Sequence, residues 1–380
     1  MKKRLPLAVL LIVILIVVGY FIWKKRSSRT DIDTIRIGAI FSSTGVAGDY
    51  GKKSIEGVEM AVEILNGSGG INGKKVSVVY EDAKSSPKDA LSAFRKLVDV
   101  DKVNIIVGDV YSSTTKVLIE NLPSNTLLFA PGASKPDLVN LNPHFLRNWT
   151  SDNFDGLAMA NVVLGDQVRE IATVTQVSDY TLSLNEAFKK EFTNKGGKIV
   201  DQESFEGEKG DYRQLLYKLK AQDPKSVYLT ALSKEMGTIL KQAKEINFTP
   251  HWYTNLTVNT DDCKKIAGSS VDGVVFSRPY IDLAHISPDS TMFISLYKSR
   301  KGTEPDETVA HAFDAMNILF LGLTKVGTNT DALVSYINSI KDYPGLSGKT
   351  TFDGYGGVLK DIEVVQMVGN SPKSLKVFSF

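Results

Sequence analysis

The chain has 380 residues, of which 42% are hydrophobic and 23% charged, and its formal net charge is +2. This composition is typical of a globular protein long enough for two domains, and it excludes a chain that is disordered throughout. The first thirty residues hold seven basic and no acidic side chains, so the rest of the chain has a net charge of −5. An acidic remainder without a basic stripe argues against nucleic acid as a partner.

The segment from Leu5 to Trp23 contains no charged residue. As a helix it would reach roughly 28 Å, close to the hydrocarbon thickness of a bilayer. Lysines and arginines flank the segment on both sides, and it has no Ala-x-Ala cleavage site and no cysteine that could carry a lipid. We therefore predict that residues 1–30 form an N-terminal membrane anchor, or an uncleaved signal, with one transmembrane helix.

From Thr34 onward, short β-branched runs alternate with amphipathic helical patterns. The first strand is expected at residues 35–41 and the first helix at residues 51–66. Further strands are expected at 75–80, 105–107, 126–130, 171–175, 198–203 and 226–230, and further helices at 87–98, 115–122, 153–164, 181–194, 211–221 and 234–246. Strands that alternate with helices of this length form parallel sheets with helices on both faces.

One sheet would need too many strands, so we expect two lobes. Turn formers and aromatic residues interrupt the pattern at residues 148–156, 276–282 and 348–354, where the chain is expected to cross between the lobes. Three crossings make both domains discontinuous and create a hinge. We assign residues 34–148 plus 280–350 to lobe 1 and residues 149–279 plus 351–380 to lobe 2.

Hydroxyl residues gather where two of the expected strands end. Ser112 to Thr115 follow the strand at 105–107, and Ser134 follows the strand at 126–130. Ligands of open α/β sheets bind beyond the carboxyl ends of the strands, where helix N-termini favour anions. Ser112 alone would only cap a helix. Two hydroxyl-bearing strand ends in one sheet together predict an anion site.

An enzyme signature is missing from the sequence. The glycine motifs of hydrolases and dinucleotide enzymes are absent, and the run from Gly345 to Thr350 lacks the first glycine of a phosphate-binding loop. A single cysteine, Cys263, excludes a cysteine-rich metal site. The histidines are scattered without metal-ligand spacing, at His144, His251, His285 and His311. We therefore expect no catalytic activity, no metal and no cofactor.

Three motifs resemble one known family. The segment from residue 35 to residue 87, then VGDVYSSTTKV, then FAPGASKPDL, resemble the opening of the periplasmic leucine/isoleucine/valine-binding proteins. These belong to the type I periplasmic-binding-protein family and are the extracellular ligand receptors of branched-chain amino-acid ABC importers. The resemblance extends over most of residues 35–380. It implies a two-lobed α/β fold, with two parallel doubly wound sheets joined by a three-strand hinge, that closes over an amino acid.

The resemblance implies six candidate ligand-binding residues: Tyr50, Ser112, Ala133, Ser134, Tyr180 and Asn255. In the family, groups at the positions of Ser112, Ala133 and Ser134 hold the ligand α-carboxylate. Tyr50 matches a pocket tyrosine of the first lobe, and Tyr180 matches one that reaches across from the second lobe. The resemblance also implies ABC permease subunits in the membrane as partners.

One part of the expected pocket departs from the family. Family members place a carboxylate after the strand that matches His251 to Thr254, where it pairs with the ligand ammonium, whereas this chain has Asn255 and Leu256. An ammonium buried without a countercharge costs several kcal/mol. Either a displaced acid such as Asp179 replaces the missing carboxylate, or the ligand lacks a buried α-ammonium.

The sequence thus favours an extracytoplasmic solute-binding receptor of an ABC importer, held at the periplasmic or outer face of the cell membrane by its N-terminal helix. Its ligand would be an amino acid or a related small carboxylate, bound without chemistry. An anchored sensor of the same fold, which signals to a separate membrane partner, is the alternative. An α/β enzyme is disfavoured because the catalytic motifs are missing.

Overall fold

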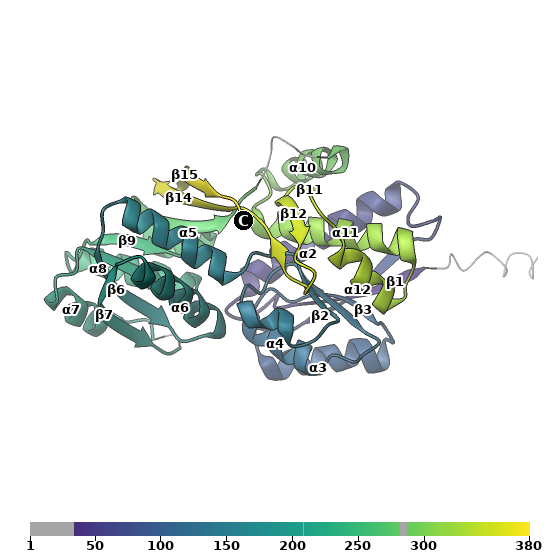
Figure 1. The fold of residues 1–380 in the computed structure, drawn as a ribbon, viewed down its shortest axis with the longest axis horizontal. Coiled ribbons are helices and arrows are strands. Elements are labelled where there is room, and N and C mark those ends of the chain that lie inside the picture. Colours follow the sequence, from purple (N-terminus) through teal and green to yellow (C-terminus); the bar gives the residue numbers. More distant parts are fainter. Residues whose placement is uncertain (1–33, 208, 282–286) are drawn as a thin grey trace, which may run out of the picture.

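The computed structural model describes residues 34–207, 209–281 and 287–380. Figure 1 shows two layered bodies side by side, and strands from the C-terminal part of the chain, in yellow, lie on both of them. We call the body with the five-stranded sheet lobe 1 and the body with the seven-stranded sheet lobe 2. The predicted transmembrane segment and the N-terminal domain at residues 1–30 lie outside the described residues.

Lobe 1 is built on a wholly parallel sheet with the strand order β2-β1-β3-β4-β5. Its strands are β1 (Ile35–Phe41), β2 (Val76–Asp82), β3 (Ile105–Gly108), β4 (Leu127–Ala130) and β5 (Phe145–Arg147). Its helices are α2 (Gly48–Gly67), α3 (Pro87–Arg95), α4 (Ser112–Glu120), α10 (Pro288–Lys301), α11 (Glu307–Val326) and α12 (Thr330–Asn338), with the short turns η1 (Lys96–Val100) and η2 (Pro136–Asn140).

Both faces of this sheet are buried, as the alternation of side chains along β1 shows. Ile37 and Phe41 share a core cluster with residues of α2 and α11. Ile40 points to the opposite face, where it belongs to a second cluster with residues of α3 and α4. A strand covered on both faces reads as a continuous apolar run, which is why the sequence predicted β1 with its observed bounds.

Lobe 2 is built on a mixed sheet with the strand order β15-β14-β10-β9-β8-β6-β7. Its strands are β6 (Glu170–Gln176), β7 (Lys198–Phe205), β8 (Ser226–Thr230), β9 (His251–Thr254), β10 (Val275–Pro279), β14 (Ile362–Val368) and β15 (Ser371–Phe378). Its helices are α5 (Asp152–Gly165), α6 (Asp179–Asn194), α7 (Arg213–Ala221), α8 (Ser233–Glu245) and α9 (Asp261–Ala267), with the turns η3 (Leu256–Asn259) and η4 (Gly268–Val271).

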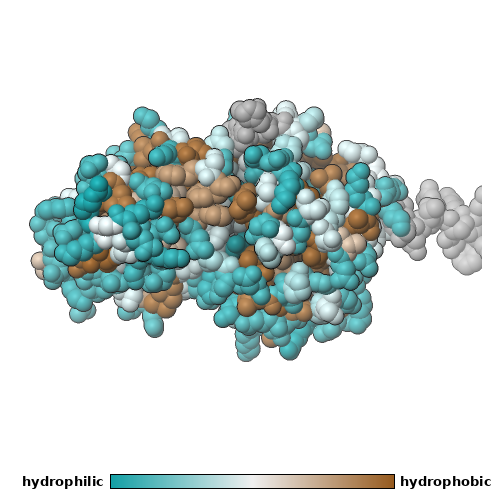
Figure 2. Space-filling model, in the orientation of Figure 1, coloured by the Kyte–Doolittle hydropathy of each residue, from teal (hydrophilic) through white to brown (hydrophobic). Residues whose placement is uncertain are grey.

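The sheet of lobe 2 is not parallel throughout, and this corrects the expectation of two parallel sheets. The strands from β7 to β10 run parallel, but β14 and β15 add an antiparallel edge. In Figure 2 hydrophobic residues gather over this strand pair, where Leu375 and Val377 are half exposed. Lys373 and Lys376 stand on the same edge strand, and lysines there disfavour pairing with a further chain.

The chain passes between the lobes three times. The first two passages follow β5 and β10, within or next to the expected segments. The third expected segment, 348–354, instead contains the whole of β12 (Gly348–Phe352), which pairs with β11 (Tyr343–Gly345) and β13 (Val358–Leu359). Phe352 and Val358 pack in the core of lobe 1. The third passage therefore lies after β13, later in the chain than the expected boundary at residue 350, and the division into two closing domains stays a prediction.

A buried polar network fixes the chain just before this third passage. The Asp314 carboxylate of α11 accepts hydrogen bonds from the backbone amides of Leu346 and Ser347, at 3.0 and 2.6 Å. The Lys360 ammonium donates to the carbonyl and hydroxyl oxygens of Ser347, at 3.0 and 2.6 Å. Burial lowers the pKa of Lys360 to about 8 and raises the pKa of Asp314, while the opposite charges of the two groups act against both changes.

Among the described residues one helix, α11, has the length and hydropathy of a membrane span. Most of α11 is buried inside lobe 1, where residues such as Val309, Phe313 and Met316 pack in the core. Its apolar character is therefore that of a central core helix.

Candidate functional site

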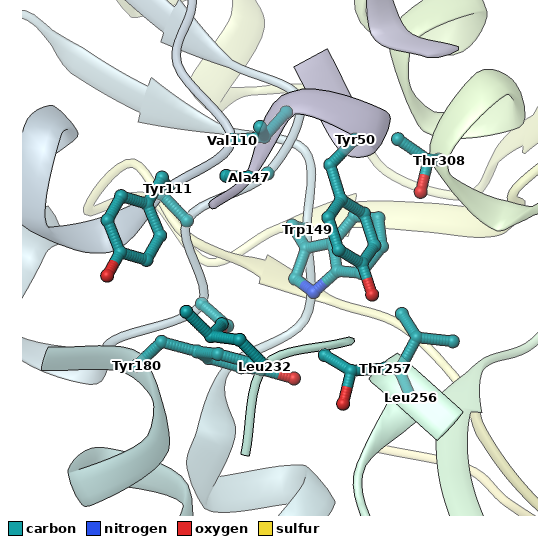
Figure 3. A pocket seen from close by; sticks show the side chains of 13 residues that line it. Ala47, Tyr50, Val110, Tyr111, Trp149, Tyr180, Leu232, Leu256, Thr257 and Thr308 are labelled. Atoms are coloured by element: carbon teal, nitrogen blue, oxygen red, sulfur yellow. The ribbon is translucent and has the colours of Figure 1, made fainter. Parts of the chain in front are cut away.

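A cavity lies between the two lobes, where loops after strands of both sheets meet. Its empty volume is about 540 Å³, including its open mouth. Figure 3 shows Tyr50 and Trp149 facing Tyr180 and Thr257 across this space. Thirteen residues line the cavity: Ala47, Tyr50, Val110, Tyr111, Gly132, Ala133, Ser134, Trp149, Tyr180, Leu232, Leu256, Thr257 and Thr308. The loops after β3 and β4 form one wall and those after β8 and β9 the other, as the strand-end rule predicts.

Four of the six candidate ligand-binding residues line this cavity. Tyr50, Ala133 and Ser134 belong to lobe 1, and Tyr180 projects from the first turn of α6 in lobe 2. Two candidates, Ser112 and Asn255, are buried directly beside lining residues and are not part of the wall. The structure thus brings the six residues together, and their contact with a ligand stays a prediction.

In the hydroxyl run after β3, Thr114 and Thr115 hold the backbone, and Ser112 and Ser113 do not. The Thr114 and Thr115 hydroxyls both donate to the carbonyl of Tyr111, at 2.8 and 2.9 Å. Helix α4 begins at Ser112 rather than at residue 115, with Tyr111 as its N-cap and no side-chain cap. The capping role considered for Ser112 is therefore wrong. Its buried hydroxyl has no hydrogen-bond partner within the described part of the chain.

The Asp109 carboxylate joins the ends of β1 and β3 to the start of α4 beside the cavity. It accepts from the backbone amide and hydroxyl of Ser42, at 2.9 and 2.6 Å, and from the Thr114 hydroxyl at 2.6 Å. Burial raises the pKa of Asp109, while these hydrogen bonds oppose that change. The network joins the ends of β1 and β3 to the start of α4, so the lining loop at Val110 and Tyr111 is held from behind.

A buried cation, the Arg147 guanidinium, holds the turn after β4 in place through hydrogen bonds to its carbonyls. Glycine is required at position 132, because a Cβ there would lie 2.7 Å from the Cα of Val110. Ala133 follows with a φ of 63°, and its amide donates to the Val110 carbonyl at 3.1 Å. The Arg147 guanidinium donates to the carbonyls of Ala133 and Lys135, at 3.0 and 2.9 Å. Because the Ala133 amide is already used, Ser134 is the candidate donor that this turn presents to the cavity.

The wall from lobe 2 is organised by Asn255. Its side-chain oxygen accepts from the amide of Ala231 at 3.2 Å, and its side-chain nitrogen donates to the carbonyl of Ala231 at 3.3 Å and to the Tyr180 hydroxyl at 3.2 Å. The Thr257 hydroxyl also donates to the Ala231 carbonyl, at 2.6 Å. Burial raises the pKa of Tyr180, so its phenol keeps its proton at neutral pH and can donate.

Several lining residues were missed by the sequence reasoning, and Trp149 is the largest. It lies in the first crossing segment, and its ring is 4.4 Å from the ring of the buried His311. His311 is held in turn by its Nδ1 contact with the carbonyl of Glu307 at 2.6 Å. An aromatic residue inside an expected crossing was the available signal for Trp149. Thr308 and Leu232 carried no comparable signal, since a threonine and a leucine at helix starts are ordinary.

Two contacts join lobe 1 and lobe 2 across the cavity in this structure. The side chain of Tyr50, from lobe 1, packs against the core cluster of lobe 2. The Lys135 ammonium lies 3.8 Å from the Asp179 carboxylate of α6. Asp179, the candidate for a displaced countercharge, is thus placed against a lysine and outside the lining residues.

Two buried acids lie behind the wall in the first turn of α5. Burial raises the pKa of Asp152 to about 6, while Ser134, Ser183 and the Arg147 charge act in the opposite direction. Burial and the nearby Asp152 raise the pKa of Asp155 to about 7. Close carboxylates in a low-dielectric site oppose each other's ionisation, so these two groups make the first passage sensitive to pH.

No group of three or more His, Cys, Asp and Glu side chains in the described part of the chain is placed to hold a metal ion. The single thiol, Cys263, is buried in the core of lobe 2, and burial raises its pKa to about 12. A thiol in that state is a poor nucleophile. The arrangement at the cavity therefore offers hydrogen-bond donors and aromatic faces to a ligand.

Comparison with known proteins agrees with this geometry. A family model described as periplasmic binding protein matches residues 34–371. The leucine-, isoleucine-, valine-, threonine-, and alanine-binding protein of Pseudomonas aeruginosa is 26% identical over 85% of this chain and 87% of its own length. The Leu/Ile/Val-binding protein BraC3 of Rhizobium johnstonii is 27% identical over 85% of this chain and 88% of its own.

Solved structures share the fold. The leucine binding protein LivK from Thermotoga maritima superposes with a TM-score of 0.85 and 24% identity, covering 91% of this chain and 99% of that one. A solute binding protein of an ABC transporter from Rhodopseudomonas palustris, in complex with 3,4-dihydroxy benzoic acid, has a TM-score of 0.81 and 20% identity, covering 91% and 98%. The type I α/β fold expected from the sequence is thereby confirmed.

Proposed function

The chain belongs to the periplasmic binding protein family, and we propose that it is the extracytoplasmic solute-binding receptor of an ABC importer. It binds an amino acid or a related small carboxylate between its lobes and delivers it to permease subunits in the membrane. The observation that carries this proposal is the cavity whose walls come from both lobes, with Tyr50 on one side and Tyr180 on the other. Such a site is complete only when the lobes are together, which couples binding to closure.

The relatives support the ligand class. The bacterial relatives above are named for binding leucine, isoleucine and valine, and one structural neighbour holds an aromatic carboxylate. All of these ligands share a carboxylate and a mainly apolar body. We place the carboxylate near Ser134 and the free hydroxyl of Ser112, and the apolar body between the aromatic rings.

A ligand screen tests the proposal. The full chain in a non-ionic detergent is heated with amino acids, amine-free carboxylates and amides, and its unfolding temperature is recorded. A ligand at about a thousand times its Kd stabilises the protein by about 4 kcal/mol, which is easily seen as a shift. A panel without any shift would contradict the proposed ligand class and favour a sensor for another kind of molecule.

The carboxylate position is tested with the ligand that the screen identifies. The Ser112→Ala variant removes a hydroxyl that has no other partner, so its affinity for that ligand should fall by about 1 to 3 kcal/mol in a calorimetric titration. Ser124→Ala, at an exposed position of lobe 1, is the control and should keep its affinity. Equal affinities for the two variants would refute the placement of the carboxylate at Ser112.

We further propose that the uncharged segment Leu5 to Trp23 holds the receptor at the outer face of the cell membrane. The full chain should then stay with the membrane fraction after an alkaline carbonate wash. A variant without residues 1–30, exported by a cleavable signal, should be released into the soluble fraction. Release of the full chain by the wash would contradict the anchor.

A further inference from the structure

The lining of the cavity carries no charge within the described part of the chain. None of its thirteen residues is an aspartate, glutamate, lysine, arginine or histidine. Its polar groups are the hydroxyls of tyrosine, serine and threonine, the Trp149 indole and the backbone. A hydroxyl or an amide can hold a carboxylate by donating to it. A buried ammonium instead needs an anion beside it.

The residues directly after β9, where the resemblance places this anion, carry no charge. The Asn255 amide is used on both sides, because its oxygen accepts from Ala231 and its nitrogen donates to Ala231 and Tyr180. The next residue, Leu256, presents an aliphatic side chain to the cavity. This part of the wall is therefore apolar where an ammonium would need its countercharge.

Two acids near the cavity, Asp179 and Glu307, lie close to cations of their own. Asp179 lies 3.8 Å from the Lys135 ammonium. Glu307, just before the lining residue Thr308, lies 4.0 Å from the guanidinium of Arg278, which also pairs with a second glutamate. Neither acid belongs to the lining. A ligand ammonium would have to displace one of these cations to gain a partner.

Two further buried acids, Asp152 and Asp155, lie behind the wall in the first turn of α5. The backbone amide of Asp152 donates to the carbonyl of Ser134 at 3.0 Å. The charge of Arg147 acts on it from the same side of the turn. Neither Asp152 nor Asp155 belongs to the lining, so neither forms part of the cavity wall.

We infer that the cavity takes a small monocarboxylate with an apolar or aromatic body and no cationic amine. The inference rests on the proposed function and narrows its ligand class. The donors at Ser112 and Ser134 hold the carboxylate, and the rings of Tyr50, Trp149 and Tyr180 cover the body (Figure 3). The uncharged wall at Leu256 favours a hydrogen or a methyl group where an amino acid carries its ammonium.

Matched ligand pairs test this inference on the full chain in detergent. Calorimetric titrations compare L-leucine with 4-methylpentanoate and L-phenylalanine with 3-phenylpropanoate, since the members of each pair differ only in the amine. We expect the amine-free acid of at least one pair to bind about 100-fold more tightly than its amino acid. 4-Methylpentanamide, which lacks the carboxylate charge, should bind no better than the amino acid.

A charge introduced into the wall should reverse this preference. The Leu256→Glu variant places a carboxylate where the wall is now apolar, and it should narrow or invert the ratio between the amine-free acid and the amino acid. Leu256→Gln has the same shape without the charge and is the matched control, which should keep the original ratio. If the glutamate variant does not fold, the titrations of the unmodified chain with the matched ligand pairs still test the inference.

The possible results distinguish a failure of this inference from a failure of the proposed function. Equal or tighter binding of the amino acids would overturn the inference and leave the proposed receptor function standing. Binding of the amide alone would overturn the inference together with the carboxylate site. Failure of every carboxylate and amide to bind would overturn the proposed ligand class itself.

Discussion

Replacing Asp155 by asparagine is expected to stabilise the folded protein at alkaline pH. The side chain of Asp155 is 7% exposed, and burial together with Asp152 raises its pKa to about 7. In an unfolded chain the pKa of an aspartate is about 3.9. The folded state therefore binds the proton more tightly than the unfolded chain, and stability falls as the pH rises from about 4 to about 7.

The size of the effect follows from this difference. Three pKa units correspond to about 4 kcal/mol of unfolding free energy at a pH above both values. Asp152 shares part of this effect, because its own ionisation becomes easier when its neighbour is neutral. We expect Asp155→Asn to be about 2 to 4 kcal/mol more stable than the unmodified protein at pH 8, and equally stable near pH 4.

Urea denaturation of the full chain in detergent, followed by circular dichroism between pH 4 and 8, measures this difference. Asp99→Asn, at an exposed position of η1, is the control and should differ little from the unmodified protein at any pH. The reasoning is refuted if the advantage of Asp155→Asn over the unmodified protein does not grow between pH 4 and pH 8.

Three further substitutions test the contacts around the cavity. Arg147→Lys keeps the charge but loses the geometry that joins two carbonyls under the β4 turn, so ligand affinity should fall by about 1 to 3 kcal/mol in calorimetry. Lys135→Ala breaks a partly exposed pair with Asp179, and titration should show a loss of about 1 kcal/mol or less. Tyr180→Phe removes one hydrogen bond with Asn255, and urea denaturation should show a loss of about 0.5 to 1.5 kcal/mol.

The elements of the fold were largely predictable because each has a strong local pattern. β1 and β8 have the expected bounds, since almost all of their residues are buried in the sheets and β-branched or aromatic residues are frequent in them. The antiparallel edge formed by β14 and β15 was not predicted. β14 pairs with β10, which is a long-range contact that no local pattern reports, and β15 then pairs with β14.

The site was predictable only in part, for a related reason. The hydroxyls of the run after β3 were visible in the sequence, but their division was not, because it depends on which of them reach Asp109 and the Tyr111 carbonyl. The start of α4 was misplaced by three residues for the same reason: Tyr111 caps it without a side-chain bond. Sequence shows which residues can donate, and only packing decides which donors stay free.

Asn255 shows what the departure from the family pattern does for the structure. An aspartate at this position could accept from the Ala231 amide, but it could not donate to the Ala231 carbonyl. The amide does both, and it also donates to Tyr180, so it joins the end of β8, the end of β9 and the start of α6. A side chain with all its groups used internally shapes the wall without meeting a ligand charge. We therefore expect the charge of the ligand to be met from lobe 1, where Ser134 lines the cavity and the free Ser112 hydroxyl lies beside it.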